Sequence, residues 1–242
     1  PVKSDLRTAR CQRRLRDLGA DAVVHMATKV KGSAALKVNR CMMDAVLSLG
    51  LPVVYASSTV VHWKTPTPYA ESRREDEQRL ADSGIPWVAL RPSAPYGPRL
   101  RHHQTGHKES FHTLSDWVRF SPFVPVIGDG EYRRQPVHVD DFSDAILALL
   151  GGELPNRALD AGGGEALSFN EIIQCMAQLR SRGGRRVHLP KQLFVMLARV
   201  HGDFDADLIR AVDEDELADS SELSALTGIE FRSFREGVRC LI

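Results

Sequence analysis

The sequence lacks several features that would assign it at once to a class of protein. Its 242 residues include only four cysteines and no CxxC pair, so the common zinc and dithiol redox motifs are excluded. No apolar run approaches the roughly 20 residues of a membrane-spanning helix, and no secretory leader pattern stands at the start. The formal net charge is +1, so bulk charge predicts neither a nucleic-acid nor a membrane partner. The widely spaced thiols favour a reducing, cytoplasmic setting.

What is present is an ordinary composition for a folded protein. Hydrophobic residues make up 43% of the chain, enough to bury a sizeable core in one large α/β domain or in a larger and a smaller one. Arginine is dense only at Arg180, Arg182, Arg185 and Arg186. A solvated loop is the first interpretation of that stretch, and phosphate binding is the alternative.

Strand-like and helix-like segments alternate in the first half of the chain. Short apolar runs rich in β-branched residues predict strands at Asp21–Ala27, Pro52–Ser57 and Ile85–Arg91. Helical periodicity covers Ala34–Leu49 and Thr67–Ser83, and the second of these helices opens with a threonine N-cap followed by proline. Strands separated by helices give right-handed βαβ units, so the pattern predicts an α/β fold with a parallel sheet.

The second half is less regular, with a loop-rich stretch over Tyr96–Gly130 that holds one helix at Ser110–Phe120. A capping box of Ser168 and Glu171 opens a further helix. The remainder is mostly helical and polar. The other expected elements are a strand at Val137–Val139, a helix at Asp140–Leu150 capped by Asp140 or Asp141, a strand at Arg157–Asp160, the capped helix at Ser168–Gln178 and an acidic helix over Asp203–Glu216.

One constellation points to chemistry at the carboxyl ends of the strands, where ligands bind in doubly wound sheets. Ser58 follows a strand, and Tyr69 begins the next helix eleven residues later. A phenol with a pKa near ~10 is a poor base at neutral pH, but a nearby cation stabilises its phenolate. Arg73 lies one helical turn beyond Tyr69 and supplies such a cation. A surface helix with a tyrosine in its first turn is the alternative.

The run VVYASSTVVHWKTPTPYAESRREDEQRLADSGIPWVALRPSAPYGP resembles the centre of the NAD-dependent epimerase/dehydratase family, within the extended short-chain dehydrogenases/reductases. Members of that family have a strand ending in SS, then YxxxK on a helix, then a strand ending LRPxxxYGP. Further matches follow the family's order along nearly the whole chain: VKSDLR, DAVVHMAT, VNRCMMDAV, GDGEYRRQPVHVDDFSDAI and ALDAGGGEALSFNEII.

The resemblance implies a Rossmann-like, doubly wound parallel sheet, truncated at its N-terminal side, with a smaller and mostly helical C-terminal substrate-binding part. Residues 1–97 would form the dinucleotide-binding part, and residues 98–242 the substrate-binding region, with 136–162 returning to the sheet. The activity implied is hydride transfer with NAD or NADP by an epimerase, dehydratase or reductase. The substrate implied is a nucleotide sugar or a similar small molecule carrying a hydroxyl or carbonyl group.

The resemblance also assigns roles to matched positions. Tyr69 would be the general acid and base, Ser58 would hydrogen-bond the substrate oxygen, and Asn39 would support the active-site helix and its water. Arg73 completes this catalytic set. The cofactor set is Asp5, Leu6, Ala27, Thr28, Ser57, Tyr69, Arg73 and Pro92. Asp5 and Leu6 would face the adenine, Ala27 and Thr28 would line the cofactor's phosphates or ribose, and Pro92 would lie near the nicotinamide. The substrate set is Ser58, Thr59, Arg133 and Arg134, and either arginine would bind a substrate phosphate. No metal is implied.

Three departures from the family pattern bear on activity. No G-x-x-G-x-x-G or G-x-G-x-x-G occurs, although the family places this phosphate-binding loop some tens of residues before Asp5. The chain begins at Pro1, so we expect the protein to start upstream; a sheet without its first strands would expose apolar faces. Arg73 replaces the family's lysine, and an arginine cannot release a proton. The segment between Ser58 and Tyr69 is also short. A non-catalytic binding or scaffold protein, or an inactive fragment, is therefore the alternative.

Other candidates have simpler interpretations. His102, His103, His107 and His112 lie close together, and a substrate loop is favoured over a metal site. His25 lies inside a predicted strand, which favours a buried core histidine. By analogy with the family, the helices at Ala34–Leu49 and Thr67–Ser83 would form a homodimer seam.

Overall fold

The structure is a computed structural model that describes residues 5–30, 32, 34–99, 110–179, 185–194, 196 and 206–241. Its centre is a sheet of four parallel strands in the order β1-β2-β3-β6. Their bounds are β1 Val23–His25, β2 Val53–Ala56, β3 Trp87–Pro92 and β6 Arg157–Ala161. This confirms the predicted α/β fold with a parallel sheet, and the four observed strands overlap those predicted at Asp21–Ala27, Pro52–Ser57, Ile85–Arg91 and Arg157–Asp160.

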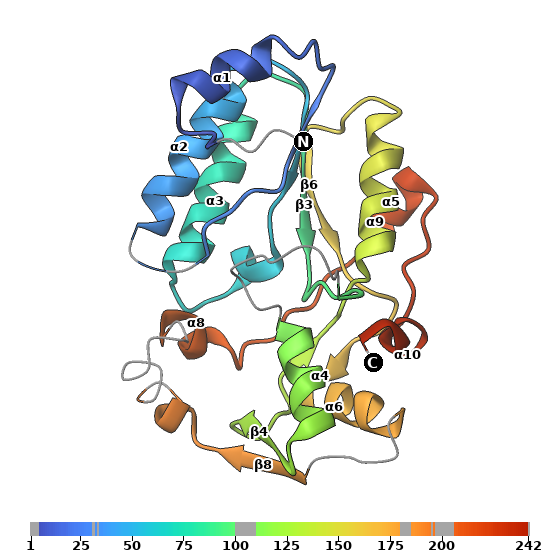
Figure 1. The fold of residues 1–242 in the computed structure, drawn as a ribbon. Coiled ribbons are helices and arrows are strands. Elements are labelled where there is room, and N and C mark those ends of the chain that lie inside the picture. The colour runs from blue at the N-terminus through green and yellow to red at the C-terminus, as the bar shows by residue number, and fades with distance from the viewer. Residues whose placement is uncertain are drawn as a thin grey trace.

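Helices cover both faces of this sheet, as Figure 1 shows. On one face lie α1 (Ala9–Arg16), α2 (Ala35–Leu47) and α3 (Pro68–Ala81), and on the other lie α5 (Val139–Leu150) and α9 (Ser221–Thr227). The strands are apolar on both faces because each face has its own layer to bury. Met43, Val46, Tyr55, Leu80 and Ala89 form one core, whereas Val88, Leu90, Phe142, Ile146 and Leu159 belong to the other.

The remaining elements gather beyond the carboxyl ends of the strands, in the lower half of Figure 1. Apolar side chains from α4, β4, α6 and α10 form one core there, in which Phe111, Val126, Ile172 and Phe234 are buried. The bounds are α4 Ser110–Phe120, β4 Phe123–Ile127, β5 Arg133–Arg134, β7 Leu167–Ser168, α6 Phe169–Gln178, β8 Arg185–Leu189, α8 Ala206–Ala211, α10 Phe234–Gly237, and the 3-10 helices η1 Thr59–His62 and η2 Val238–Leu241.

Two local predictions in this region are confirmed. Helix α4 spans the predicted residues Ser110–Phe120. Helix α6 has the predicted capping box, in which the Ser168 hydroxyl accepts from the Glu171 amide and the Glu171 carboxylate accepts from the Ser168 amide.

The prediction around residue 138 was wrong in two respects. Val137–Val139 is not a strand, because only one isolated bridge joins Tyr96 to His138 and α5 already begins at Val139. The cap of α5 is His138, whose Nδ1 accepts from the Asp140 amide at 3.2 Å. Asp141 instead binds Arg232 from the C-terminal segment, with contacts of 2.5–3.0 Å.

Four further predictions for the second half were wrong. Strand β4 lies in the stretch predicted as loop, and β8 in the part predicted as mostly helical; the two pair in parallel. Arg185 and Arg186 therefore belong to a strand and not to a solvated loop, while Arg180 and Arg182 lie outside the described residues. The acidic helix predicted over Asp203–Glu216 ends at Ala211.

The edge strand β1 leaves apolar side chains in water. Val24 is 40% exposed and Met26 is 56% exposed. Within the described part of the chain, no helix is both long and apolar enough to cross a bilayer.

Candidate active site

Local sequence signals bring Ser58 and Tyr69 to the carboxyl edge of the sheet. Ser58 follows β2 and caps η1, where its Oγ accepts a 3.4 Å hydrogen bond from the Val60 amide. Thr67 caps α3, with its Oγ1 3.1 Å from the Ala70 nitrogen, and proline occupies the first helical position. Tyr69 therefore lies in the first turn of α3, close to the end of β2.

Arg73 lies one turn further along α3 and is almost completely buried, with 1% of its surface exposed. Its guanidinium carbon lies 5.2 Å from the centre of the Tyr69 ring and 5.1 Å from that of Tyr55. Nη2 donates to the Thr28 hydroxyl at 2.8 Å, and Nη1 donates to the Ala56 carbonyl at 3.3 Å. The third nitrogen, Nε, is buried without a hydrogen-bond partner. Arg73 thus supplies positive charge beneath Tyr69.

The electrostatic environment of Tyr69 combines opposing influences. Burial raises the pKa of the Tyr69 phenol, while the charge of Arg73 and a hydrogen bond with Ser58 act to lower it. The carboxylate of Glu216 acts in the same direction as burial. The phenol is therefore protonated at neutral pH and is available to donate a proton.

Asn39 on α2 joins the loop after β1 to α3. Its Oδ1 accepts from the Lys29 amide at 2.8 Å, and its Nδ2 donates to the Lys29 carbonyl at 3.0 Å and to the Ser72 hydroxyl at 2.8 Å. The side chain is 1% exposed, so these bonds form away from water. Asn39 thereby fixes the loop that contains Thr28 against the helix that contains Arg73.

We expect the Asn39→Ala variant to lose about 2 kcal/mol of unfolding free energy, because the Lys29 amide and the Ser72 hydroxyl lose a buried partner. Urea unfolding followed by circular dichroism measures this loss. Lys37→Ala, at an exposed position of the same helix, is the control and should change stability by less than about 0.5 kcal/mol. Equal stability of the two variants would contradict the role given to Asn39.

The residues that follow β1 are exposed to solvent, whereas the hydroxyls of Ser57 and Thr59, which follow β2, form hydrogen bonds within the protein. Ala27 and Thr28 are exposed. The Ser57 hydroxyl donates to the Glu77 carboxylate at 2.5 Å, and the buried Thr59 hydroxyl donates to the carbonyl of Pro92 at 3.3 Å. The side chains of Ser57 and Thr59 therefore hold the strand ends together, and Ala27 and Thr28 present the accessible surface.

Asp5 and Leu6 lie before α1, at the start of the first described segment. The Asp5 carboxylate is exposed and accepts 2.6–3.1 Å hydrogen bonds from the Arg7 side chain and amide. The side-chain hydrogen bond with Arg7 is the main cause that lowers the pKa of Asp5 to about 2. Asp5 is therefore ionised and paired with its neighbour.

The two candidate phosphate-binding arginines differ in their surroundings. Arg134 is 8% exposed and donates to the carbonyls of Glu214 (2.5 Å) and Val212, with Nε 3.5 Å from the Glu216 carboxylate. Arg133 is exposed and donates to the Ala166 carbonyl at 3.2 Å. The guanidinium of Arg134 thus anchors the backbone, and that of Arg133 keeps more donors free for solvent.

Residues 212–217, which we call the acidic strap, were not predicted to contribute to the site. The Glu214 carboxylate accepts from the amides of Lys64 and Thr65 at 2.7 and 2.8 Å, which fixes the loop that precedes Tyr69. Burial acts to raise the pKa of Glu214, but the hydrogen bonds from Thr65 and Lys64 lower it overall. The run of acidic residues was the only signal in the sequence, and it had been interpreted as a solvated helix face.

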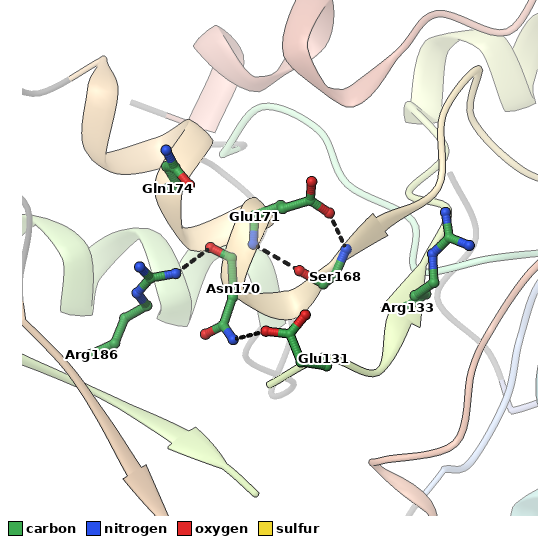
Figure 2. A pocket seen from close by; sticks show the side chains of 7 residues that line it. All are labelled: Glu131, Arg133, Ser168, Asn170, Glu171, Gln174 and Arg186. Atoms are coloured by element: carbon green, nitrogen blue, oxygen red, sulfur yellow. Dashed lines mark hydrogen bonds between the residues drawn. The ribbon is translucent and has the colours of Figure 1, made fainter. Parts of the chain in front are cut away.

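A separate hollow of about 400 Å³ lies in the C-terminal half, lined by Glu131, Arg133, Ser168, Asn170, Glu171, Gln174 and Arg186 (Figure 2). Arg133 is its only member from the predicted substrate set. Its two acidic and two basic side chains balance in charge. The first amides of α6 are already bonded to Tyr132, Gly130 and Ser168. This hollow is therefore not the site built around Tyr69.

The histidines do not form a metal site among the described residues, where no group of three potential ligands occurs. His102, His103 and His107 lie outside the described residues, and His112 Nε2 lies 2.9 Å from the Gly97 carbonyl. His25 is a buried core residue, as predicted, and stacks on Tyr55 with ring centres 5.6 Å apart. Burial, with the charge of Arg73, lowers its pKa to about 4.

Comparison with known proteins decides the family. A model of the NAD dependent epimerase/dehydratase family matches residues 2–162. The chain belongs to this family. Among curated relatives, "Uncharacterized UDP-glucose epimerase YtcB" of Bacillus subtilis (strain 168) is 28% identical over 100 residues. That match covers 41% of this chain and 30% of the relative, so it spans under a third of the relative's length.

Solved structures of the family share the fold over almost the whole chain. The UDP-glucose 4-epimerase of Thermotoga maritima with UDP-glucose matches with a TM-score of 0.77 and 19% identity, over 99% of this chain and 82% of that one. MoeE5 in complex with UDP-glucuronic acid and NAD gives 0.74 and 20%, over 99% and 83%. The dTDP-glucose 4,6-dehydratase of Bacillus anthracis in complex with NAD gives 0.78 and 16%, over 98% and 76%. The TM-scores establish a common fold, and at identities this low the matches establish the fold alone.

Proposed function

We propose that the protein is an NAD(P)-dependent epimerase, dehydratase or reductase that acts on a nucleotide sugar or a similar small molecule with a hydroxyl or carbonyl group. Membership of the family supports this activity. The matched structures named above include complexes with NAD, UDP-glucose and UDP-glucuronic acid, which supports the cofactor and the substrate class.

The observation that carries the proposal is the placement of Tyr69. Its phenol shares a hydrogen bond with Ser58 and lies over the guanidinium of Arg73, at the carboxyl edge of a parallel sheet. Ligands of doubly wound sheets bind beyond this edge. A proton donor, an orienting hydroxyl and a fixed cation therefore meet where a ligand would bind.

The residues at this edge fit the ribose and nicotinamide end of the cofactor. Ala27 and Thr28 are exposed after β1, and Tyr69 with Ser58 lies beyond the end of β2. The Nε donor of Arg73 is buried without a partner beneath this surface. No residue of the printed sequence supplies the glycine-rich loop for the pyrophosphate, so the fit concerns the ribose and nicotinamide end alone.

When bound, the nicotinamide accepts or supplies the hydride. The chain's own residues handle the proton and the geometry. Tyr69 donates its phenol proton to a carbonyl oxygen, and in the reverse direction its phenolate takes the proton from a substrate hydroxyl, while Ser58 holds that oxygen in place. Arg73 stabilises the phenolate without exchanging a proton. Arg133, with its exposed guanidinium, is the better placed of the two arginines to meet a substrate phosphate.

Fluorescence titration with NADH and NADPH tests the proposal directly. We expect saturable binding of at least one of them, seen as a change in nicotinamide emission. A control titration of the same dinucleotides into heat-unfolded protein should show no saturation at the same concentrations. Absence of binding for both dinucleotides would overturn the proposed function.

A non-catalytic binding protein is the second candidate, and the burial of Arg73 favours it. Two of its terminal donors are bonded to Thr28 and Ala56 and only 1% of it is exposed, so the guanidinium is not free to bind cofactor hydroxyls. Binding of NADH without turnover of any UDP-sugar or dTDP-sugar would support this candidate.

A homodimer through α2 and α3 is part of the same proposal. The two helices pack side by side, and ion pairs of Arg40 with Glu75 and of Arg79 with Asp44 join them. A seam built on them would be polar and salt-sensitive. Sedimentation velocity at low and high salt measures the association.

A further inference from the structure

Asp76 is buried one turn beyond Arg73 on α3. It is 2% exposed, and its Oδ2 lies 3.6 Å from Arg73 Nη2. The same oxygen accepts a 2.8 Å hydrogen bond from the hydroxyl of Tyr55, which is fully buried. A single oxygen of the Asp76 carboxylate thus contacts both the Arg73 guanidinium and the Tyr55 hydroxyl.

Four side chains surround the Arg73 guanidinium, in addition to the Ala56 carbonyl that accepts from Nη1. The ring of Tyr69 lies on the ligand side, and the ring of Tyr55 lies on the core side. Thr28 accepts from Nη2, and Asp76 supplies the negative charge. Because the guanidinium is buried, its charge is poorly screened, and a carboxylate at this distance offsets much of its effect on a neighbouring phenol.

We propose that Asp76 is a positioning residue that fixes the Arg73 guanidinium against Tyr69 and offsets its charge, so that the carboxylate at position 76 controls how readily Tyr69 ionises. This inference rests on the proposed function for its catalytic meaning. The coupling of Asp76 to Tyr69 through Arg73 does not depend on a bound ligand.

Other charged and titratable groups lie around Asp76, Arg73, Tyr55 and Tyr69 and affect their ionisation. From the helix itself, Glu75 and Arg79 act on Asp76; from β1, His25 stacks on Tyr55; from the acidic strap, Glu216 acts on Tyr69. Burial raises the pKa of Asp76, while the hydrogen bond from Tyr55 and the charge of Arg73 act to lower it. His25 is neutral at pH 7, because its pKa is lowered to about 4.

The test measures Tyr69 ionisation without turnover. The chain contains four tyrosines, so selective ¹³Cζ labelling gives four signals, and Tyr69→Phe identifies the signal of Tyr69. In Asp76→Asn the amide oxygen can still accept from Tyr55, but the charge of Arg73 is no longer offset. We expect the pKa of Tyr69 to fall by about one unit or more relative to the wild type.

Two further variants complete the experiment. Asp82→Asn removes an exposed carboxylate at the end of the same helix and should leave the Tyr69 signal unchanged. The double variant Arg73→Met with Asp76→Asn removes both buried charges and should raise the pKa of Tyr69 above that of the wild type. It also keeps the test decisive if the single variant fails to fold around an unbalanced charge.

The inference is overturned if Asp76→Asn titrates like the wild type, or, where that variant does not fold, if the double variant titrates like the single variant Arg73→Met. Failure of the proposed function gives a different result. In that case NADH does not bind, whereas the order of Tyr69 pKa values, Asp76→Asn below wild type below the double variant, is still observed.

Discussion

Replacing Tyr69 with phenylalanine is expected to lower kcat by about a hundredfold or more on the nucleotide sugar that the protein turns over, because the proton donor is lost. The ring itself is retained, so its contact with the Arg73 guanidinium, 5.2 Å away, should persist. Affinity for NADH should therefore change little, and the effect should fall on kcat rather than on cofactor binding. Steady-state kinetics with a parallel NADH titration measures both quantities.

Tyr96→Phe is the matched control for this experiment. The Tyr96 hydroxyl is buried in the C-terminal core and donates to the Ser233 carbonyl at 3.4 Å, far along the chain from the candidate site. Its loss should affect stability slightly and leave kcat within about twofold. If Tyr69→Phe turned over substrate as fast as the wild type, Tyr69 would not be the proton donor, and the role proposed for Ser58 would also be wrong.

Replacing Gly163 with alanine is expected to give the largest loss of stability, about 3 kcal/mol, equivalent to about 6–12 °C in Tm. Gly163 follows β6, and its amide donates to the Gln135 carbonyl at 3.1 Å. A Cβ at this position would overlap the carbonyl oxygen of Pro136, and backbone on both sides cannot move aside as a flexible side chain could. Differential scanning calorimetry measures the shift.

Gly152→Ala is the control, since no atom lies within 4 Å of the position its Cβ would occupy. It should change stability by no more than about 0.5 kcal/mol. If the two variants melt together, the packing of residues 162–164 against the segment before α5 is not as tight as the structure shows.

The catalytic hypothesis could be made from the sequence because its parts are local. Ser58 follows a strand, Thr67 and the following proline start a helix, and Tyr69 and Arg73 are one turn apart in it. Each of these signals spans a few residues, and the structure places the residues together as that spacing requires.

The part of the site formed by the acidic strap could not be predicted. Glu214 bonds to the amide of Lys64, which lies 150 residues earlier in the chain. The sequence shows only an acidic run there, and a solvated helix face has the same composition. Strand β4 was missed for a similar reason: Pro125 lies within it, and a strand with an internal proline carries a weak signal unless its partner β8 is known.

By itself, the sequence determined the alternation of strands and helices, the parallel sheet, the family and the spacing of Tyr69, Ser58 and Arg73. Only the tertiary structure decided that Arg73 is buried against two tyrosine rings and paired with Asp76. The physical reason is the separation along the chain over which each interaction acts. Hydrophobic periodicity and helix caps act within one element, whereas burial and charge pairing depend on which elements pack together, and that is settled only when the whole chain has folded.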